Sequence, residues 1–276
     1  MSKKCWLNLH KNAGYLEKLP QHLSYYWERC YEKKIDPHTT FVTYSPKQLK
    51  KAKEQAIKIY AYTNRCLYLM MNYNNNPHLG FAVFDSDCCL LKLYGSRQFL
   101  DWCHSHNIKP GTVWTEDSIG ANAVSIGIET KRPTAVVGSE NYCRLLIDTA
   151  VYFYPYTLNE ENSTYHTIIY GGLALIVPYE YRDPNYLMLA AAVSNDITLH
   201  LYMADELHCL YAESKGLISI DINTVTNKPH ILYHSLTIFN ILETNPTDLY
   251  FKDVDTLFDP LPKNKAFWEI IEQTKK

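Results

Sequence analysis

Apolar residues near the start of the chain recur every three or four positions, the spacing that gives a helix one apolar stripe. This pattern covers residues 19–33 and predicts a first helix there. Ser45 and Pro46 supply an N-cap and a first-turn proline, and the stripe that follows predicts a second helix to about Asn72. We therefore expect residues 1–76 to form an N-terminal helical segment.

From residue 79 the pattern changes to short β-rich runs separated by polar turns. The runs at 79–84 and 89–94 are joined by Asp85-Ser86-Asp87, which predicts a hairpin. Further strands are expected at residues 133–137, 149–156 and 168–177, with helices at 96–106, 119–131 and 140–148. A long helix is predicted from Asp183-Pro184 to about Ala212. This order predicts an α+β domain over residues 77–212, an antiparallel sheet flanked by helices.

A third pattern begins after this helix. Residues 216–222 alternate as a strand does, and residues 231–233 predict a second strand. Short helices are expected at 235–242 and 265–273. About 60 residues is little for an independent domain, so we expect residues 213–276 to form a small α+β segment that is part of a larger module.

Composition and charge exclude some classes of protein. The chain is 46% hydrophobic and 20% charged with a net charge of −2, an ordinary globular balance that does not fit a domain built to bind nucleic acid. The basic residues from Lys47 to Lys53 are interpreted as a solvated helix face. No apolar run reaches the ~18 residues of a membrane span, and no secretory signal is found at the start. A cytoplasmic location without membrane contact is therefore expected.

Motifs for catalysis and metal binding are absent from the sequence. None of the eight cysteines forms a Cys-x-x-Cys pair, so no zinc site is expected. The chain has no G-x-S-x-G, H-E-x-x-H, G-x-G-x-x-G or G-x-x-x-x-G-K-[ST] motif. We therefore expect no enzyme, no bound cofactor and, within these 276 residues, no ATPase motor. No convincing helix-turn-helix is found either.

Residues 111–143 carry the most specific signal, GTVWTEDSIGANAVSIGIETKRPTAVVGSENYC. They resemble the GAF domain of AcoR-like and DhaR-like transcription activators, which work with sigma-54 polymerase. The positions that match the family pattern are Gly111, Trp114, Glu116, Gly120, Asn122, Ala123, Arg132, Pro133, Val136, Gly138, Glu140 and Cys143. About a dozen matches in order over this length are far more specific than one short motif.

The resemblance extends to both sides of this stretch. Residues 24–37 are similar to the family's N-terminal helix through Trp27, Arg29, Cys30 and Pro37. Residues 171–173 resemble the glycine-led last strand of the GAF sheet, and residues 216–258 resemble the opening half of a PAS domain. The resemblance thus implies a helical segment, a GAF sensor domain and a partial PAS-like segment.

Departures from the family pattern fall where a binding pocket would be lined. Ala121 replaces the usual Thr, Asn141 the usual His and Tyr142 the usual Phe. The family's second cysteine and its Asp-x-[ST]-Gly ending have no counterpart. The effector is therefore expected to differ from those of the known relatives.

Seven residues are predicted to line a ligand site. They are Trp114, Glu116, Asn122, Tyr142, Cys143, Tyr152 and Tyr154, the last two in an aromatic strand at residues 152–156. Several also have a structural interpretation. Trp114 would serve as a core anchor, Glu116 as a carboxylate at the positive end of a helix, Asn122 as a partner of the loop backbone, and Cys143 as a buried thiol.

These features predict the effector-sensing region of a bacterial transcription activator. A small metabolite would bind between the sheet and residues 111–131. The apolar stripe on the long helix would form a homodimer or, equally well, pack within the domain. Contact with DNA and sigma-54 polymerase would belong to domains absent from this sequence. Two alternatives remain: a protein-interaction module controlled by a partner protein, and a redox or gas sensor that uses Cys143 or a bound haem or iron.

Overall fold

The structure is a computed structural model, and it describes most of the chain between Leu19 and Leu210. The described residues are 6, 7, 9, 10, 19–56, 63, 66, 67, 76–159, 167–210, 218–223, 228–234, 254 and 265–274. They divide into two compact units, the first made of residues 1–56 and 69–198 and the second of residues 57–68 and 199–276. The division into segments 1–76, 77–212 and 213–276 stays a prediction.

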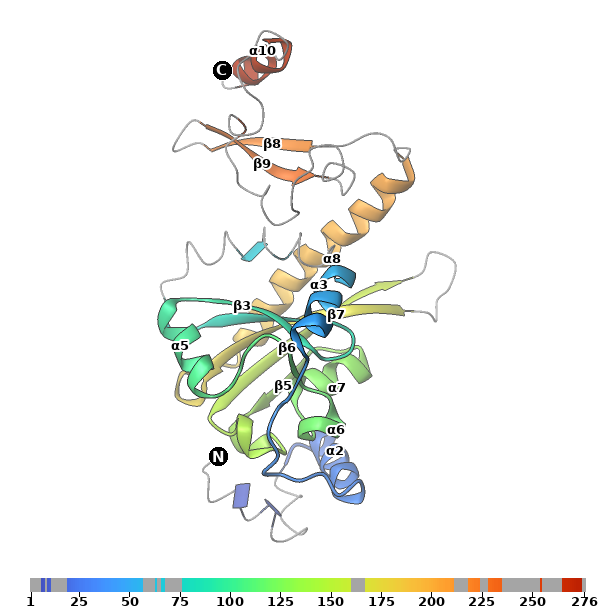
Figure 1. Ribbon diagram of the computed structural model, residues 1–276, viewed down its shortest axis with the longest axis vertical. Coiled ribbons are helices and arrows are strands. Elements are labelled where there is room, and N and C mark those ends of the chain that lie inside the picture. The colour runs from blue at the N-terminus through green and yellow to red at the C-terminus, as the bar shows by residue number, and fades with distance from the viewer. Residues whose placement is uncertain are drawn as a thin grey trace. The chain divides into compact units, whose positions relative to one another are not determined.

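A five-stranded antiparallel sheet forms the centre of the first unit (Figure 1). Its strands lie in the order β3-β2-β7-β6-β5. Their bounds are β2 Gly80–Phe84, β3 Leu90–Gly95, β5 Thr134–Val137, β6 Thr149–Asn159 and β7 Thr167–Pro178. All five predicted strands are therefore present. A separate pair joins β1 (Val42–Thr43) to β4 (Thr112–Val113).

The first hairpin of the sheet forms where local chemistry predicts it. Between β2 and β3 the carboxylate of Asp85 accepts hydrogen bonds from the backbone N–H groups of Asp87 at 3.0 Å and Cys89 at 2.8 Å. Such an Asx turn closes a hairpin without help from the rest of the fold. Helix α5 (Arg97–Ser105) follows, and the hydroxyl of Ser96 caps it by accepting from Phe99 N–H.

The predicted single helix at 119–131 is wrong in one respect, because two helices occupy this stretch. The first, α6 (Glu116–Ile119), ends at Gly120, where φ is +70°. A Cβ at that position would lie 2.3 Å from the ring of Tyr142, so only glycine fits there. The second, α7 (Ala123–Thr130), starts from Asn122 as its N-cap.

The predicted helix at 140–148 is also wrong. The structure has two short 3₁₀ turns instead, η2 (Gly138–Glu140) and η3 (Arg144–Leu146), with extended backbone between them. Indole N–H groups from the N-terminal part of the chain donate to carbonyls in this gap, Trp27 to Glu140 O at 2.9 Å and Trp6 to Asn141 O at 3.1 Å. These bonds replace the ones a helix would have supplied.

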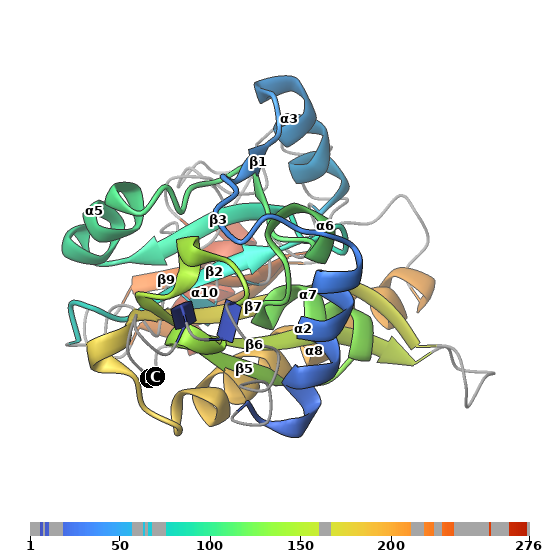
Figure 2. The same ribbon diagram turned by 90° about the horizontal axis from the view of Figure 1, so that it is seen from below.

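Helix α2 (Gln21–Glu32) confirms the first predicted helix and buries Leu23, Tyr26, Trp27 and Cys30. Helix α3 (Pro46–Gln55) starts at Ser45 with the predicted capping arrangement, closed by Gln48. Its predicted continuation to Asn72 lies almost wholly outside the described residues. In Figure 2, α2, α6 and α7 lie side by side, and all three contribute to the main core.

The long helix is present as α8 (Tyr186–Leu210). Ala190, Val193 and Ile197 from its predicted stripe are buried within the chain itself, so packing inside the chain accounts for this part of the stripe.

The second unit contains the hairpin of β8 (Ile218–Asn223) with β9 (Lys228–His234), and helix α10 (Lys265–Thr274). These confirm three predicted elements, and the helix expected at 235–242 lies outside the described residues. None of the described helices is both long and apolar enough to cross a membrane.

The ring of Phe153 occupies the space between the sheet and α7. A Cβ added at Gly127 of α7 would lie 2.3 Å from this ring, and one added at Gly172 of β7 would lie 2.2 Å from it. Phe153 is fully buried, and its ring meets Phe84 with centroids 6.3 Å apart. The two glycines therefore make room for a side chain that fills this layer of the core.

Replacing Gly127 by Ala tests this packing. In an ordinary helix the change adds about 0.5–1 kcal/mol of stability, but here we expect a loss of about 1–3 kcal/mol from overpacking. In a Phe153→Leu background the smaller side chain gives way, so Gly127→Ala should cost at least about 1 kcal/mol less. Urea unfolding of the four proteins measures the coupling, and equal costs in both backgrounds would contradict the packing described.

Candidate functional site

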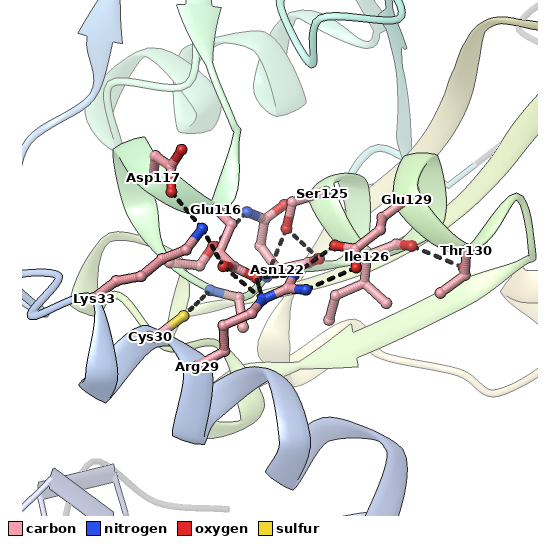
Figure 3. Close-up of polar contacts among 12 residues, drawn as sticks. Arg29, Cys30, Lys33, Glu116, Asp117, Asn122, Ser125, Ile126, Glu129 and Thr130 are labelled. Atoms are coloured by element: carbon pink, nitrogen blue, oxygen red, sulfur yellow. Dashed lines mark hydrogen bonds and ion pairs between the residues drawn. The ribbon is translucent and has the colours of Figure 1, made fainter.

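Five of the seven predicted site residues gather on one side of the sheet. Trp114, Glu116 and Asn122 lie in the connection from β4 through α6 to α7, and Tyr142 and Cys143 lie between η2 and η3. The backbone N–H of Tyr142 donates to the carbonyl of Ala121 at 3.1 Å, which joins the two stretches. This side also receives α2, and Figure 3 shows the polar contacts between them.

Glu116 is the electrostatic centre of this region. Its carboxylate, 8% exposed, accepts from Arg29 Nε at 2.8 and 2.9 Å and pairs with Lys33 Nζ at 3.0 Å (Figure 3). Arg29 also donates to Glu129 of α7 at 2.8 Å, and Lys33 donates to Asp117 at 2.7 Å. These hydrogen bonds raise the pKa of Arg29 further above its ordinary value and lower the pKa of Glu129. Arg29 of α2 and Lys33, which follows the helix, are thus held by three carboxylates of α6 and α7.

Asn122 uses its whole side-chain amide within the protein. The oxygen accepts from the N–H groups of Val124 at 3.0 Å and Ser125 at 3.1 Å, and the nitrogen donates to the carbonyls of Trp114 at 2.9 Å and Gly120 at 2.8 Å. Both donor hydrogens are used, and the oxygen accepts two bonds. The sequence allowed two interpretations of Asn122, a hydrogen-bond partner of the loop backbone or a ligand contact. The structure shows the hydrogen bonds to the backbone.

Trp114 is fully buried and contacts two aromatic rings. Phe41 stacks on it with centroids 5.5 Å apart, and Phe84 of β2 meets it edge-on at 5.2 Å. Its indole N–H donates to the hydroxyl of Thr112 at 3.0 Å. Its full burial, its two ring contacts and the use of its one donor are the arrangement of a core anchor.

An aromatic cluster surrounds His10. Its ring lies 4.4 Å from Trp6, 4.8 Å from Trp27, 4.9 Å from Tyr142 and 5.9 Å from Tyr31, measured between centroids. Its Nε2 lies 2.9 Å from the carbonyl of Tyr142 and must be the donor, because a carbonyl only accepts. Burial lowers the pKa of His10 below its ordinary value, and the nearby His38 adds to this effect. This cluster fixes the N-terminal residues to the stretch that carries Tyr142 and Cys143.

Cys143 is a buried thiol. Its Sγ lies 3.9 Å from the carbonyl of Thr39, and burial raises the pKa of the thiol to about 11. It is therefore protonated at neutral pH, when the thiolate is the reactive form. Among the residues that the structure describes, no three His, Cys, Asp or Glu side chains are placed to hold a metal ion.

Tyr152 and Tyr154 lie apart from the other five, because alternate residues of a strand point to opposite faces. Val151 and Phe153 belong to the core cluster with α7, whereas Tyr152 contacts the beginning of α8, where its hydroxyl accepts from the N–H of Asp183 at 3.1 Å and its ring meets Tyr186 at 5.8 Å. The aromatic strand at residues 152–156 therefore does not present all its rings on one face of the sheet. Its members divide between the two faces of the sheet.

The structure also adds residues that the sequence did not single out as site residues. Arg29 was matched to the N-terminal motif and Glu129 was not noticed, although both belong to the ionic cluster around Glu116. Arg29 and Glu116 are 87 positions apart, and the only available signal was that both matched the same family pattern. No periodicity indicated the ring cluster around His10.

Comparison with solved structures finds the same fold in another protein. A chain of the crystal structure of the E. coli DhaR(N)–DhaL complex superimposes with a TM-score of 0.59 and 17% sequence identity, covering 91% of this chain and 86% of that one. No family model matches the sequence, and no curated protein matches it. At this identity the likeness establishes the fold, an α+β architecture with an antiparallel sheet flanked by helices.

Glu116→Gln tests the ionic cluster. The change leaves Arg29 and Lys33 without a buried counter-charge, so we expect unfolding free energy to fall by about 1–3 kcal/mol. Asp117→Asn is the matched control, since Asp117 is 79% exposed and also pairs with Lys33; its loss should stay below about 1 kcal/mol. Similar losses in the two variants, measured by urea unfolding, would refute the central place of Glu116.

The environment of His10 predicts a pH dependence. Its pKa is lower in the folded protein than the ordinary 6.5, so its contribution is fully present above pH 6.5 and is lost as the pH falls toward the folded value. The wild-type melting temperature should therefore fall more between pH 7.5 and 5.5 than that of His10→Gln, which keeps a donor for the Tyr142 carbonyl. Equal falls in the two proteins would show that His10 does not titrate as described.

Proposed function

We propose that this chain is a sensory regulatory region that receives its signal from a protein bound on its surface. One observation carries the proposal: side chains that were predicted to bind a ligand already make their contacts within the fold. Asn122 makes four hydrogen bonds to backbone, and Trp114 is fully buried, with Phe41 stacked on its ring and its N–H bound to Thr112. A ligand between the sheet and α7 would also have to displace the ring of Phe153, which the two glycines enclose.

The solved structure with the same fold supports this choice over a free metabolite. It holds DhaR(N) in complex with another protein, DhaL. In the proposal this chain corresponds to DhaR(N) and binds a protein partner of its own. The family resemblance of residues 111–143 supports the further proposal that the chain is part of a transcription activator that acts in the cytoplasm as a homodimer. Contact with DNA and sigma-54 polymerase then belongs to parts outside this sequence, and the chain itself catalyses no reaction.

A small metabolite is the second candidate, and one observation favours the α8 side of the sheet for it. Ser194 of α8 is fully buried, and its hydroxyl finds no hydrogen-bond partner among the described residues. It lies two helical turns after Tyr186, which contacts Tyr152. A buried polar group without a partner is costly, and a ligand hydroxyl or carbonyl would satisfy it. In this version Tyr152 and Tyr154 are the ligand residues.

A redox sensor based on Cys143 has the least support. Its thiol is buried and has a pKa of about 11, whereas redox-sensing cysteines are exposed and have low pKa values.

Two measurements on the full chain distinguish the first two candidates. A thermal-shift screen with polyols, amines and aromatic acids should leave the melting temperature unchanged, while a partner isolated by affinity capture and then purified should bind in a 1:1 ratio by calorimetry. The proposal of a protein partner is wrong if no purified protein binds and a small molecule raises the melting temperature by several degrees. Tyr154→Ala should then abolish that shift, because the ligand would lie on the α8 side.

A further inference from the structure

Three aromatic rings form a cage that holds the imidazole of His10. The centroids of these rings lie 5.1 Å apart for Trp27 and Tyr142, 5.6 Å for Tyr31 and Tyr142, and 6.2 Å for Trp27 and Tyr31. The His10 ring contacts all three, at 4.8 Å from Trp27, 5.9 Å from Tyr31 and 4.9 Å from Tyr142. The walls of the cage thus come from α2 and from the stretch between η2 and η3, and not from the part of the chain that carries His10.

The contacts that fix two of the three walls do not involve the occupant of the cage. The indole N–H of Trp27 donates to the carbonyl of Glu140 at 2.9 Å, and the hydroxyl of Tyr142 donates to the carbonyl of Ile35 at 3.0 Å. The Tyr142 ring also rests on Gly120, where an added Cβ would lie 2.3 Å from it. These bonds and contacts hold both walls in place whether or not the cage is filled.

The occupant is a short stretch of chain that includes Trp6, Leu9 and His10, and we call it the His10 segment. The indole N–H of Trp6 donates to both carbonyls of residues 141–142, at 3.1 Å each. The carbonyl of Leu9 accepts from the hydroxyl of Tyr31 at 2.7 Å. The segment is therefore attached to the cage through ring N–H and carbonyl groups, which any peptide with a Trp or His side chain also carries.

We infer that this cage is a peptide-binding site that the His10 segment occupies in cis, and that a Trp- or His-bearing segment of the partner protein takes its place. Buried carbonyls need N–H donors, and aromatic walls favour edge contacts from other rings. A charged side chain suits the cage less, because burial already lowers the pKa of His10. A tethered occupant competes at an effective concentration on the order of millimolar, so only a partner segment that binds well displaces it.

An exchange of segments at the cage would act directly on the region that carries the family motif. The backbone N–H of Tyr142 donates to the carbonyl of Ala121 at 3.1 Å, in the link between α6 and α7. This inference deepens the proposed function by naming the site that a partner protein would occupy. It rests on that proposal for the partner only, since the site itself is defined by the contacts within the chain.

Peptide binding to the full chain tests the site. We expect a synthetic peptide with the sequence of residues 3–12 to bind the double variant Trp6→Ala and His10→Ala in a 1:1 ratio by calorimetry. The wild type should bind this peptide at least about tenfold more weakly, because its own segment competes. The matched control is the peptide with the same two substitutions, which should bind neither protein, and circular dichroism checks that the variant is folded. A folded variant that binds no peptide, or equal binding by variant and wild type, would overturn the inference.

Hydrogen exchange of the wild type gives a second readout that needs no variant. The indole N–H of Trp6 should exchange at least about tenfold faster than that of Trp114 when both are followed by NMR, since a displaceable segment detaches without unfolding of the core. Equal exchange rates would mean that the segment leaves only when the whole unit unfolds, and no partner could then replace it.

Competition separates this inference from the proposed function. A purified partner that binds the chain should compete with the peptide for the double variant. Binding without competition would overturn the cage as the partner's site and leave the proposed function standing. If no partner binds although the peptide does, the proposed function fails and the site occupied in cis remains.

Discussion

The carbonyl groups of residues 140–142 need hydrogen-bond donors that their own neighbourhood does not supply. This stretch lies between two 3₁₀ turns and belongs to no strand, so its carbonyls would be buried without partners. Trp27 donates to Glu140, Trp6 to Asn141 and Tyr142, and His10 also to Tyr142. Three rings from the first 27 residues thus complete a segment more than 100 positions away. The N-terminal residues are therefore part of the same unit as the sheet.

This dependence decides what the α6–α7 region can do. The ring of Tyr142 rests on Gly120, where no Cβ fits, and its hydroxyl donates to the carbonyl of Ile35 at 3.0 Å. Gly120 in turn precedes Asn122, whose amide closes the loop onto the start of α7. Gly120, Asn122 and Tyr142 are thus each engaged with another part of the same unit. A conformational signal is easier to deliver to such a site by moving the N-terminal elements than by inserting a ligand.

An element could be predicted from the sequence when the residues that stabilise it lie close together along the chain. The β2–β3 hairpin was predicted correctly because Asp85 bonds to residues two and four positions away. The helix expected at 140–148 was wrong because its competing partners, Trp6 and Trp27, lie 135 and 113 positions away. Local apolar spacing there favours a helix, and no local feature announces the distant donors.

The candidate site shows the same limit in two forms. The aromatic run at 152–156 was recognised, but the faces of its residues depend on the packing of α7 and α8, which the strand itself does not encode. The capping of α7 by Asn122 was one of two interpretations, because an Asn before a helix suits a cap and a ligand contact equally well. The pairing of Arg29 with Glu116 joins two helices that the sequence places far apart. Only the family pattern connected them.

Helix α2 is attached to the unit by two kinds of contact that respond to different conditions. Toward α6 and α7 it is held by the ion pairs of Arg29 and Lys33, which are partly exposed and weaken with salt. Toward residues 140–142 it is held by the buried ring of Trp27, which contacts Tyr142, and by the indole hydrogen bond of Trp27 to Glu140, which salt does not screen. A protein that binds α2 and competes for Arg29 would loosen the first attachment and leave the second in place. In the proposed function α2 is therefore the element on which a bound protein would act.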